Sequence, residues 1–270
     1  MKPDDALKIL LVLAGISLFS VRLMAAPVLQ LGASVSVFDY EERDRNGFVL
    51  DTEKGVLPGV YASVCTPCDL PVSLILAGRW ETNTVDYEGV TNIGNIPLST
   101  QSQAYIYEIQ AMIRHRFPAL SWMASIQAGA GYREWQREIR STPVASGLFE
   151  TYKWPYVIFG GSLIFHDNGI SKFLVGADLK VATDPKLDVE FFLPFDAITV
   201  AQGSTLGLSV YSTLGKKKGQ LPWFVEPYID VWSASKGPTS SLTRNGSIVG
   251  TVEEPESTTV QAGLRLGLYF

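Results

Sequence analysis

Long stretches of the chain alternate between apolar and polar residues with a period of two. Over 260–270, apolar side chains occupy every second position, and Gly263 and Arg265 are among the residues between them. Successive side chains of a β-strand point to opposite faces, so this pattern predicts a strand with one apolar and one polar face. The same alternation is clear in 119–137, 171–182 and 221–234.

The alternating segments are about 12–18 residues long, whereas strands of soluble domains average about 5–6 residues. Long alternating strands with a polar inner face are typical of transmembrane barrels. We therefore expect an all-β fold, a closed antiparallel transmembrane β-barrel of ten strands. The predicted strands are 28–42, 55–65, 70–84, 102–116, 119–137, 152–166, 170–183, 202–214, 221–235 and 257–270.

The connections between these strands sort into short and long ones in strict alternation. Short turns are expected around 65–71, 116–119, 166–169 and 214–220, and long loops at 43–54, 85–101, 138–151, 184–201 and 236–256. Short periplasmic turns and long external loops are the rule for bacterial barrels. Segment 186–199 is apolar enough to form a further strand or a hairpin above the membrane, so eight or twelve strands remain possible.

The N-terminal segment 1–25 has the pattern of a cleaved signal peptide, and 26–270 would then form the barrel. Its apolar stretch from Ile9 to Val21 follows two lysines and is too short for a membrane span. An uncleaved anchor is the alternative. The whole chain is 46% hydrophobic and 18% charged, with a mean hydropathy of +0.14. No later apolar run reaches about 18 residues, so spanning strands must account for this composition. The net charge of −5 gives no reason to expect nucleic-acid binding.

The final residues, LRLGLYF, resemble the assembly signal of Gram-negative outer-membrane proteins, with Leu264, Leu266, Leu268 and Phe270 in register. In those proteins a glycine is often found at the position that Arg265 occupies in this chain. The chain as a whole resembles the small outer-membrane β-barrels, among them the ten-stranded omptin and adhesin-type barrels. The resemblance implies insertion into the bacterial outer membrane by the barrel-assembly machinery, and contact with outer-membrane lipids and lipopolysaccharide.

Aromatic residues are expected on the lipid-facing side at two levels, as in the interfacial belts of membrane barrels. The predicted girdle consists of Trp80, Tyr105, Tyr107 and Tyr132 near the outer ends, and Trp122, Phe173 and Trp223 near the periplasmic ends. Phe191, Phe192 and Phe195 form a predicted apolar patch in an outer loop, and exposed apolar patches mark interaction sites.

Charged residues that alternate with the lipid-facing positions should line the lumen. They are Arg79, Glu81, Glu108, Arg114, Arg133, Asp178, Lys180, Glu226, Asp230 and Arg265. Antiparallel register places Glu226 near Arg265 and Arg79 near Glu108, and opposite charges on adjacent strands stabilise pairing. Ten strands favour a lumen filled by side chains, because open porins need 16 or more. A narrow passive channel is the alternative.

Catalysis, metal binding and cofactor binding are not expected. The resemblance to omptin proteases would imply an Asp pair and a His at the outer rim, whereas His115 and His166 fall at the predicted periplasmic ends. A His-independent hydrolase that uses Asp51, Asp86 or Glu88 is a further alternative, because paired carboxylates can perform acid–base chemistry. We therefore expect a structural or surface-interaction barrel with an unidentified surface ligand.

Cys65 and Cys68 have the spacing of a thiol–disulfide motif. The thioredoxin-like fold that such redox motifs require is not indicated by this sequence. Two cysteines in an oxidising compartment favour a structural disulfide, with free thiols as the alternative.

Overall fold

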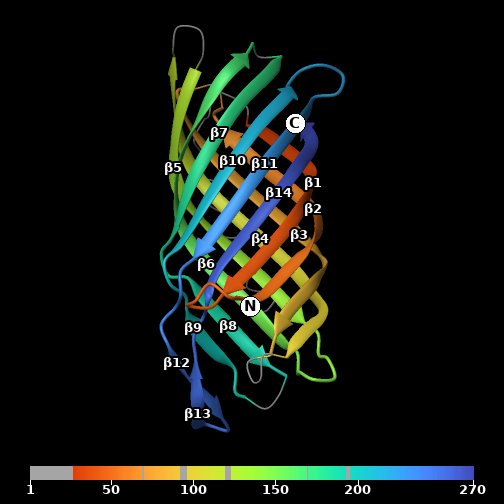
Figure 1. The fold of residues 1–270 in the computed structure, drawn as a ribbon. Helices are drawn as coiled ribbons and strands as arrows, with labels where there is room; N and C mark the ends of the chain where they lie inside the picture. The colour runs from red at the N-terminus through yellow and green to blue at the C-terminus, as the bar shows by residue number, and fades with distance from the viewer. Residues whose placement is uncertain (1–26, 69, 92–95, 119–122, 169, 193–194) are drawn as a thin grey trace.

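The computed structural model describes residues 27–270 except 69, 92–95, 119–122, 169 and 193–194. The predicted signal peptide 1–25 and Trp122 of the predicted girdle lie outside the described residues. No helix in the described part of the chain is long and apolar enough to cross a membrane. Ten long strands form a barrel (Figure 1): β1 Val28–Arg43, β2 Val49–Thr66, β3 Val72–Val90, β4 Pro97–Pro118, β5 Met123–Ile139, β6 Leu148–Asp167, β7 Ser171–Ala182, β10 Thr205–Lys216, β11 Trp223–Ala234 and β14 Glu256–Tyr269.

The sheet closes on itself without an open edge between the first and last strands. Each barrel strand pairs antiparallel with its neighbours in the order β1-β2-β3-β4-β5-β6-β7-β10-β11-β14, and β14 pairs with β1 from Gln30↔Tyr269 to Arg43↔Glu256. Closure satisfies the backbone hydrogen bonds of every strand, which a lipid environment requires. The predicted ten-stranded antiparallel barrel is confirmed.

The two ends of the barrel differ as the turn lengths predict. Phe270 lies at the end with the short turns, at the top of Figure 1, where its backbone pairs with that of Leu29. Two additional hairpins extend from the opposite end: β8 (Lys186–Phe191) with β9 (Ile198–Ala201), and β12 (Ser240–Arg244) with β13 (Ser247–Val252). Because β8 pairs only with the outer part of β6 and with β9, segment 186–199 adds a hairpin to the loops and leaves the strand count at ten.

Several strands are longer than predicted at their outer ends. Strand β2 begins at Val49 instead of 55, and β4 begins at Pro97 instead of 102. Beyond the membrane both faces of a strand meet polar surroundings, so the apolar–polar contrast that marks a strand in the sequence disappears. Backbone pairing continues there, as in the register of β3 with β4 up to Val90↔Pro97.

The two faces of the barrel separate the residues as the alternation predicts. The exposed large apolar side chains of the strands include Leu31, Val35, Val37, Val60, Leu74, Ile113, Ile126, Phe159, Leu163, Leu179, Leu208, Val210, Ile229 and Leu266. Buried polar and charged residues occupy the alternate positions and fill the lumen. The hydrophobic surface is therefore outside, where lipid replaces water, and the candidate site is the lumen.

Candidate functional site

A compact layer of charges crosses the middle of the lumen. Arg79 Nη2 lies 2.7 Å from Glu108 and 2.5 Å from Asp230, and Lys180 Nζ lies 2.8 Å and 3.2 Å from the same two carboxylates. Arg133 is fully buried and approaches Asp230 at 3.3 Å. Arg79 on β3 and Asp230 on β11 come from strands on different sides of the barrel, so their ion pair spans the lumen. Charges removed from water are costly unless they are paired, and these cations and carboxylates meet that requirement.

Neutral donors complete the central layer. Glu81 accepts hydrogen bonds from Tyr228 Oη and Gln261 Nε2, each at 2.8 Å. Tyr156 Oη donates to Glu108 at 2.7 Å, and Ser209 donates to Asp230 at 2.6 Å. The carboxylates of this layer are thereby held in place from several strands.

Aromatic side chains pack against the outer side of the charge layer and cross the lumen. Trp135 of β5 lies 4.7 Å from the ring of Tyr40 of β1 and stacks on Tyr152 of β6 at 4.7 Å between ring centroids. The series continues from Tyr152 to Trp154 and then to Trp232 of β11. All five rings are buried. Because β1, β5 and β11 lie around the wall, the connected rings cross the lumen at this height.

Arg137 is the centre of a second buried charge cluster near the outer end. Its guanidinium pairs with Glu150 and lies 3.0 Å from Glu42, 3.5 Å from Glu53 and 3.7 Å from Asp51. Several carboxylates thus share one arginine. Sequence reasoning missed this cluster, although Trp135 and Arg137 continue the lumen-facing series from Arg133 at every second position.

Glu254 links the outer cluster to the last loop. Gln202 Nε2 donates to Glu254 at 3.4 Å, and the indole of Trp154 donates to the same glutamine. Burial, together with repulsion from Glu42 and Glu150, raises the pKa of Glu254 well above its usual range.

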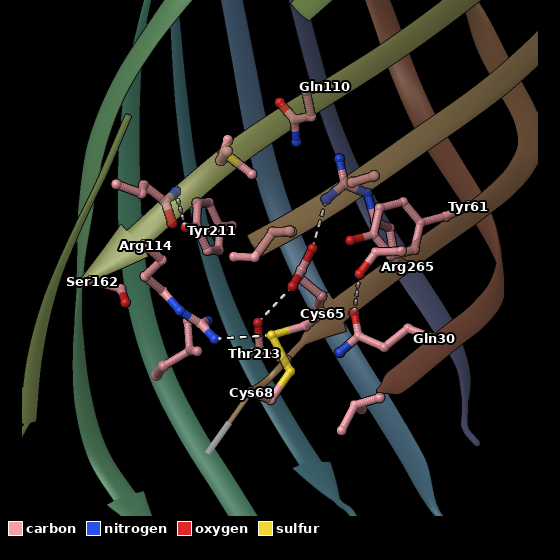
Figure 2. Close-up of a pocket in the computed structure, with 18 of the residues that line it drawn as sticks. Gln30, Tyr61, Cys65, Cys68, Gln110, Arg114, Ser162, Tyr211, Thr213 and Arg265 are labelled. Carbon is pink, nitrogen blue, oxygen red and sulfur yellow. Dashed lines mark hydrogen bonds and ion pairs between the residues drawn. A yellow bond between two sulfur atoms is a disulfide. The ribbon is translucent and has the colours of Figure 1, made fainter. Parts of the chain in front are cut away.

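A cavity of 430 Å³ occupies the lumen on the other side of the charge layer and reaches the short turns (Figure 2). Arg265 Nη1 pairs with Glu226 at 2.6 Å, and Thr213 donates to the same carboxylate at 2.5 Å. Arg114 projects from β4 into the cavity, as Figure 2 shows, and donates to Cys65 Sγ at 3.2 Å. The cavity ends at the charge layer, whose side chains form its floor.

Similarity to known proteins is found at the level of structure. No protein-family model matches the chain, and no curated protein matches it. The outer membrane protease OmpT from Escherichia coli is similar with a TM-score of 0.55 and 12% identity, over 93% of this chain and 99% of that chain. The translocator domain of the autotransporter NalP from Neisseria meningitidis has a TM-score of 0.41 and 10% identity, over 98% and 97% of the two chains. A major outer membrane protein from Thermus thermophilus has a TM-score of 0.38 and 10% identity, over 88% and 99%.

The ten-strand closure with an apolar exterior, together with the similarity to OmpT, decides the class. The chain has the fold of a bacterial outer-membrane β-barrel. At these identities the similarity concerns the fold alone, so the chemistry of this barrel has to be read from its own residues.

The predicted lumen residues of the barrel all lie on its inner face. The pair Glu226–Arg265 is joined at 2.6 Å and the pair Arg79–Glu108 at 2.7 Å. Asp178 accepts a hydrogen bond from Gln127 at 2.5 Å. The remaining members are Glu81, Arg114, Arg133, Lys180 and Asp230, which are buried.

The described members of the predicted girdle and the assembly signal lie on the outer surface of the barrel. Trp80 and Tyr107 are exposed next to one another in register, and Phe173 is exposed near the short turns. Tyr105, Tyr132 and Trp223 are half-buried. Phe270 is 66% exposed, and Leu264, Leu266 and Leu268 lie on the same face of β14.

The candidate catalytic residues of the barrel do not converge. His115 lies beside Phe117 at the end of β4, and His166 bonds Ser171 at the end of β6, so both are near the short turns. Asp86 and Glu88 are exposed on β3. Asp51, expected in an outer loop, instead belongs to β2 and is buried in the Arg137 cluster, because β2 extends beyond its predicted start.

The two cysteines of the barrel form a disulfide, Cys65–Cys68, in the wall of the cavity (Figure 2). Among the described residues, no group of three or more His, Cys, Asp or Glu side chains could hold a metal ion.

Proposed function

We propose that this barrel is a non-conducting, non-enzymatic surface protein whose external loops bind a partner or surface outside the cell. The observation that best supports this proposal is the distribution of exposed apolar side chains over the external loops. Each of the five long connections has at least one such residue: Phe48, Ile96, Val144, Phe192 with Phe195, and Ile248 with Val249. Ile248 is 71% exposed. Grouped exposed apolar residues are typical of interaction sites.

Contacts between the loops support a prearranged binding surface. Glu253 of the last loop lies 3.3 Å from Arg45 of the first loop and 2.7 Å from Lys236. Asp196, next to Phe195, accepts hydrogen bonds from the backbone of the β12–β13 turn. Loops held in place before binding lose less conformational entropy when a partner arrives.

Two of the three members of the predicted Phe patch belong to the exposed surface of the external loops. Phe192 and Phe195 are exposed, whereas Phe191 is half-buried and packs against the buried cluster of the lumen. Phe191 lies on β8, and its ring contacts that of Phe195 at 5.4 Å. Phe191 therefore supports Phe195 from the buried side and is not part of the exposed surface.

The arrangement of ionisable groups favours a non-enzymatic role over a hydrolase. The outer carboxylates of the Arg137 cluster, which would be the acid–base candidates at the loop end, are buried. Their side chains are ion-paired to that arginine. A nucleophile or general base must reach its substrate, and these groups are enclosed by the fold.

The test compares bacterial cells that display the barrel with cells that display a variant carrying Phe192→Ser, Phe195→Ser, Ile248→Ser and Val249→Ser. Retention on phenyl-coated and fibronectin-coated surfaces should fall at least about fivefold in the variant, because each buried apolar side chain contributes about 1.5–3 kcal/mol. Thr251→Ser in the same hairpin is the matched control and should retain binding. Equal retention of wild type and variant would contradict the proposal, as would peptide cleavage by the pure wild-type protein.

A further inference from the structure

Positively charged side chains outnumber negatively charged ones around the cavity at the short-turn end. Five of its lining side chains near the turns are cationic: Arg114, Arg116, Lys172, Lys217 and Lys218. The carboxylates that line the cavity lie deeper, at Glu108, Asp178, Glu226 and Asp230. Each of these four accepts a hydrogen bond from a neighbouring lumen side chain.

The hydrogen-bond and ion-pair partners of these five cations leave much of their positive charge without a carboxylate partner. Lys217 pairs with Asp167 at 2.8 Å. Arg114 is 7% exposed, and among the described residues its donors meet neutral partners, Ser73 Oγ and Cys65 Sγ, both at 3.2 Å. The Nε atom of Arg116 is buried without an acceptor among the described residues. Lys172 faces Asp167 in the register of β6 with β7, so Lys172 and Lys217 share one carboxylate.

These cations also repel one another. Lys172 lines the same cavity as Arg114, Arg116 and Lys217, so these like charges are enclosed together. Repulsion is strong where protein walls exclude water and lower the effective dielectric constant. An anion in the cavity would relieve it.

We propose that this cavity binds a small phosphate-bearing anion that enters from the periplasmic side. Guanidinium groups bind phosphate oxygens in a bidentate manner and lysines add point charges, so the residue types match that ligand. A volume of 430 Å³ suits a small molecule, within the roughly 300–1,000 Å³ of typical ligand pockets. Ile75, Met112 and Leu174 give the wall an apolar part that can contact the remainder of the ligand.

This site is independent of the external loops, since the aromatic layer separates the two ends of the lumen. The phosphate group could belong to a free anion or to the headgroup of a phospholipid in the inner leaflet. Both sources present the same chemistry to the cations, and the probes below distinguish them.

The experiment titrates the refolded barrel in a non-ionic detergent with inorganic pyrophosphate and, separately, with glycerol phosphate as the headgroup probe. Calorimetry should detect binding of at least one probe by the wild type. Lys172→Gln should weaken that binding about tenfold, the loss of one charge-assisted bond. Lys54→Gln, which removes the same charge on the outside of the barrel, should leave the affinity unchanged. Binding of only one probe identifies the source.

Thermal unfolding gives a second readout that separates binding from a structural role. Without ligand, Lys172→Gln should raise the Tm, because the repulsion from three enclosed cations outweighs the attraction of Asp167. With ligand, the same variant should gain less in Tm than the wild type. The absence of binding to both probes would overturn the proposal, as would equal affinities of wild type and Lys172→Gln.

Discussion

Arg265 shows how one residue of the lumen is held. It faces Glu226 directly in the register of β14 with β11, and the rings of Tyr61 and Tyr228 flank its guanidinium at 4.7 Å and 4.2 Å. Thr213 adds a hydrogen bond to the same carboxylate. The charge is thus matched by an ion pair and by two aromatic faces, both of which attract a cation. A barrel with a polar interior depends on such pairs in place of a hydrophobic core.

The ion pair between Arg265 and Glu226 should contribute a coupling energy to the stability of the barrel. Arg265→Ala and Glu226→Ala should each destabilise the barrel, and the double variant should lose less than the sum, with a coupling of about 1–2 kcal/mol. Urea unfolding in detergent micelles gives the free energies of unfolding that this double-mutant cycle compares. Lys54 and Asp39 form an exposed pair at 3.3 Å on the outer surface, and their cycle should give a coupling close to zero. Independent effects of Arg265 and Glu226 would reject the contact.

The β12–β13 hairpin shows how one element is fixed to another. Its turn contains Asn245 and Gly246, both at positive φ, 51° and 74°, which is the geometry of a tight hairpin turn. Their backbone N–H groups donate to the carboxylate of Asp196 at 3.0 Å and 2.9 Å. The backbone N–H of Asp196 donates to the carbonyl of Thr243 at 2.9 Å. The turn therefore clamps the loop that carries Phe195.

This clamp should depend on pH. The N–H group of Gly246, the side chain of Thr243 and the N–H group of Asn245 lower the pKa of Asp196 below its usual 3.8. A carboxyl with a lowered pKa in the folded state stabilises the fold above its usual pKa. That contribution is lost as the pH falls through the lowered value. The clamp should therefore be intact at neutral pH and open in strong acid.

Amide hydrogen exchange at Asn245 and Gly246 measures the opening. Protection should be lost in Asp196→Asn at neutral pH, since a neutral amide is a weaker acceptor than a carboxylate. Asp184→Asn is the control, because Asp184 pairs with Lys186 elsewhere in the same loop. Unchanged protection in Asp196→Asn would contradict the clamp.

The whole molecule is a tube whose two ends differ. The aromatic layer and the central charges cross the middle, the cationic cavity opens at the short turns, and the external loops extend from the other end. The buried rings come from β1, β5, β6 and β11, so they contact one another across the lumen and not only along the wall. We expect this packing to block a continuous water path through the barrel.

Planar-bilayer recordings test this closure. The wild type should show no stable stepwise current. Trp154→Ala combined with Trp232→Ala removes two rings from the layer and should produce measurable conductance or frequent opening. Trp80→Ala removes an exposed tryptophan from the outer face of the barrel and should behave as the wild type does. Stable current steps in the wild type would contradict a filled lumen.

The period-two pattern was sufficient to predict the fold and the inner face of each strand. A residue such as Arg265 between two leucines can face only the lumen if the leucines face lipid. Outside the membrane this contrast fades, which explains why the outer extension of β2 and the burial of Asp51 were not anticipated.

The sequence by itself determined which residues enter the lumen and which face lipid, because alternation along a strand is a local property. Only the tertiary structure decided which lumen residues meet. The contact of Arg79 with Asp230, the cluster around Arg137 and the series from Trp135 to Trp232 join strands that are not neighbours. Strand tilt and the closure of the sheet set the heights at which such residues meet, and neither is encoded in the pattern of a single strand. The same closure gathers Arg114 and Lys172 in one cavity.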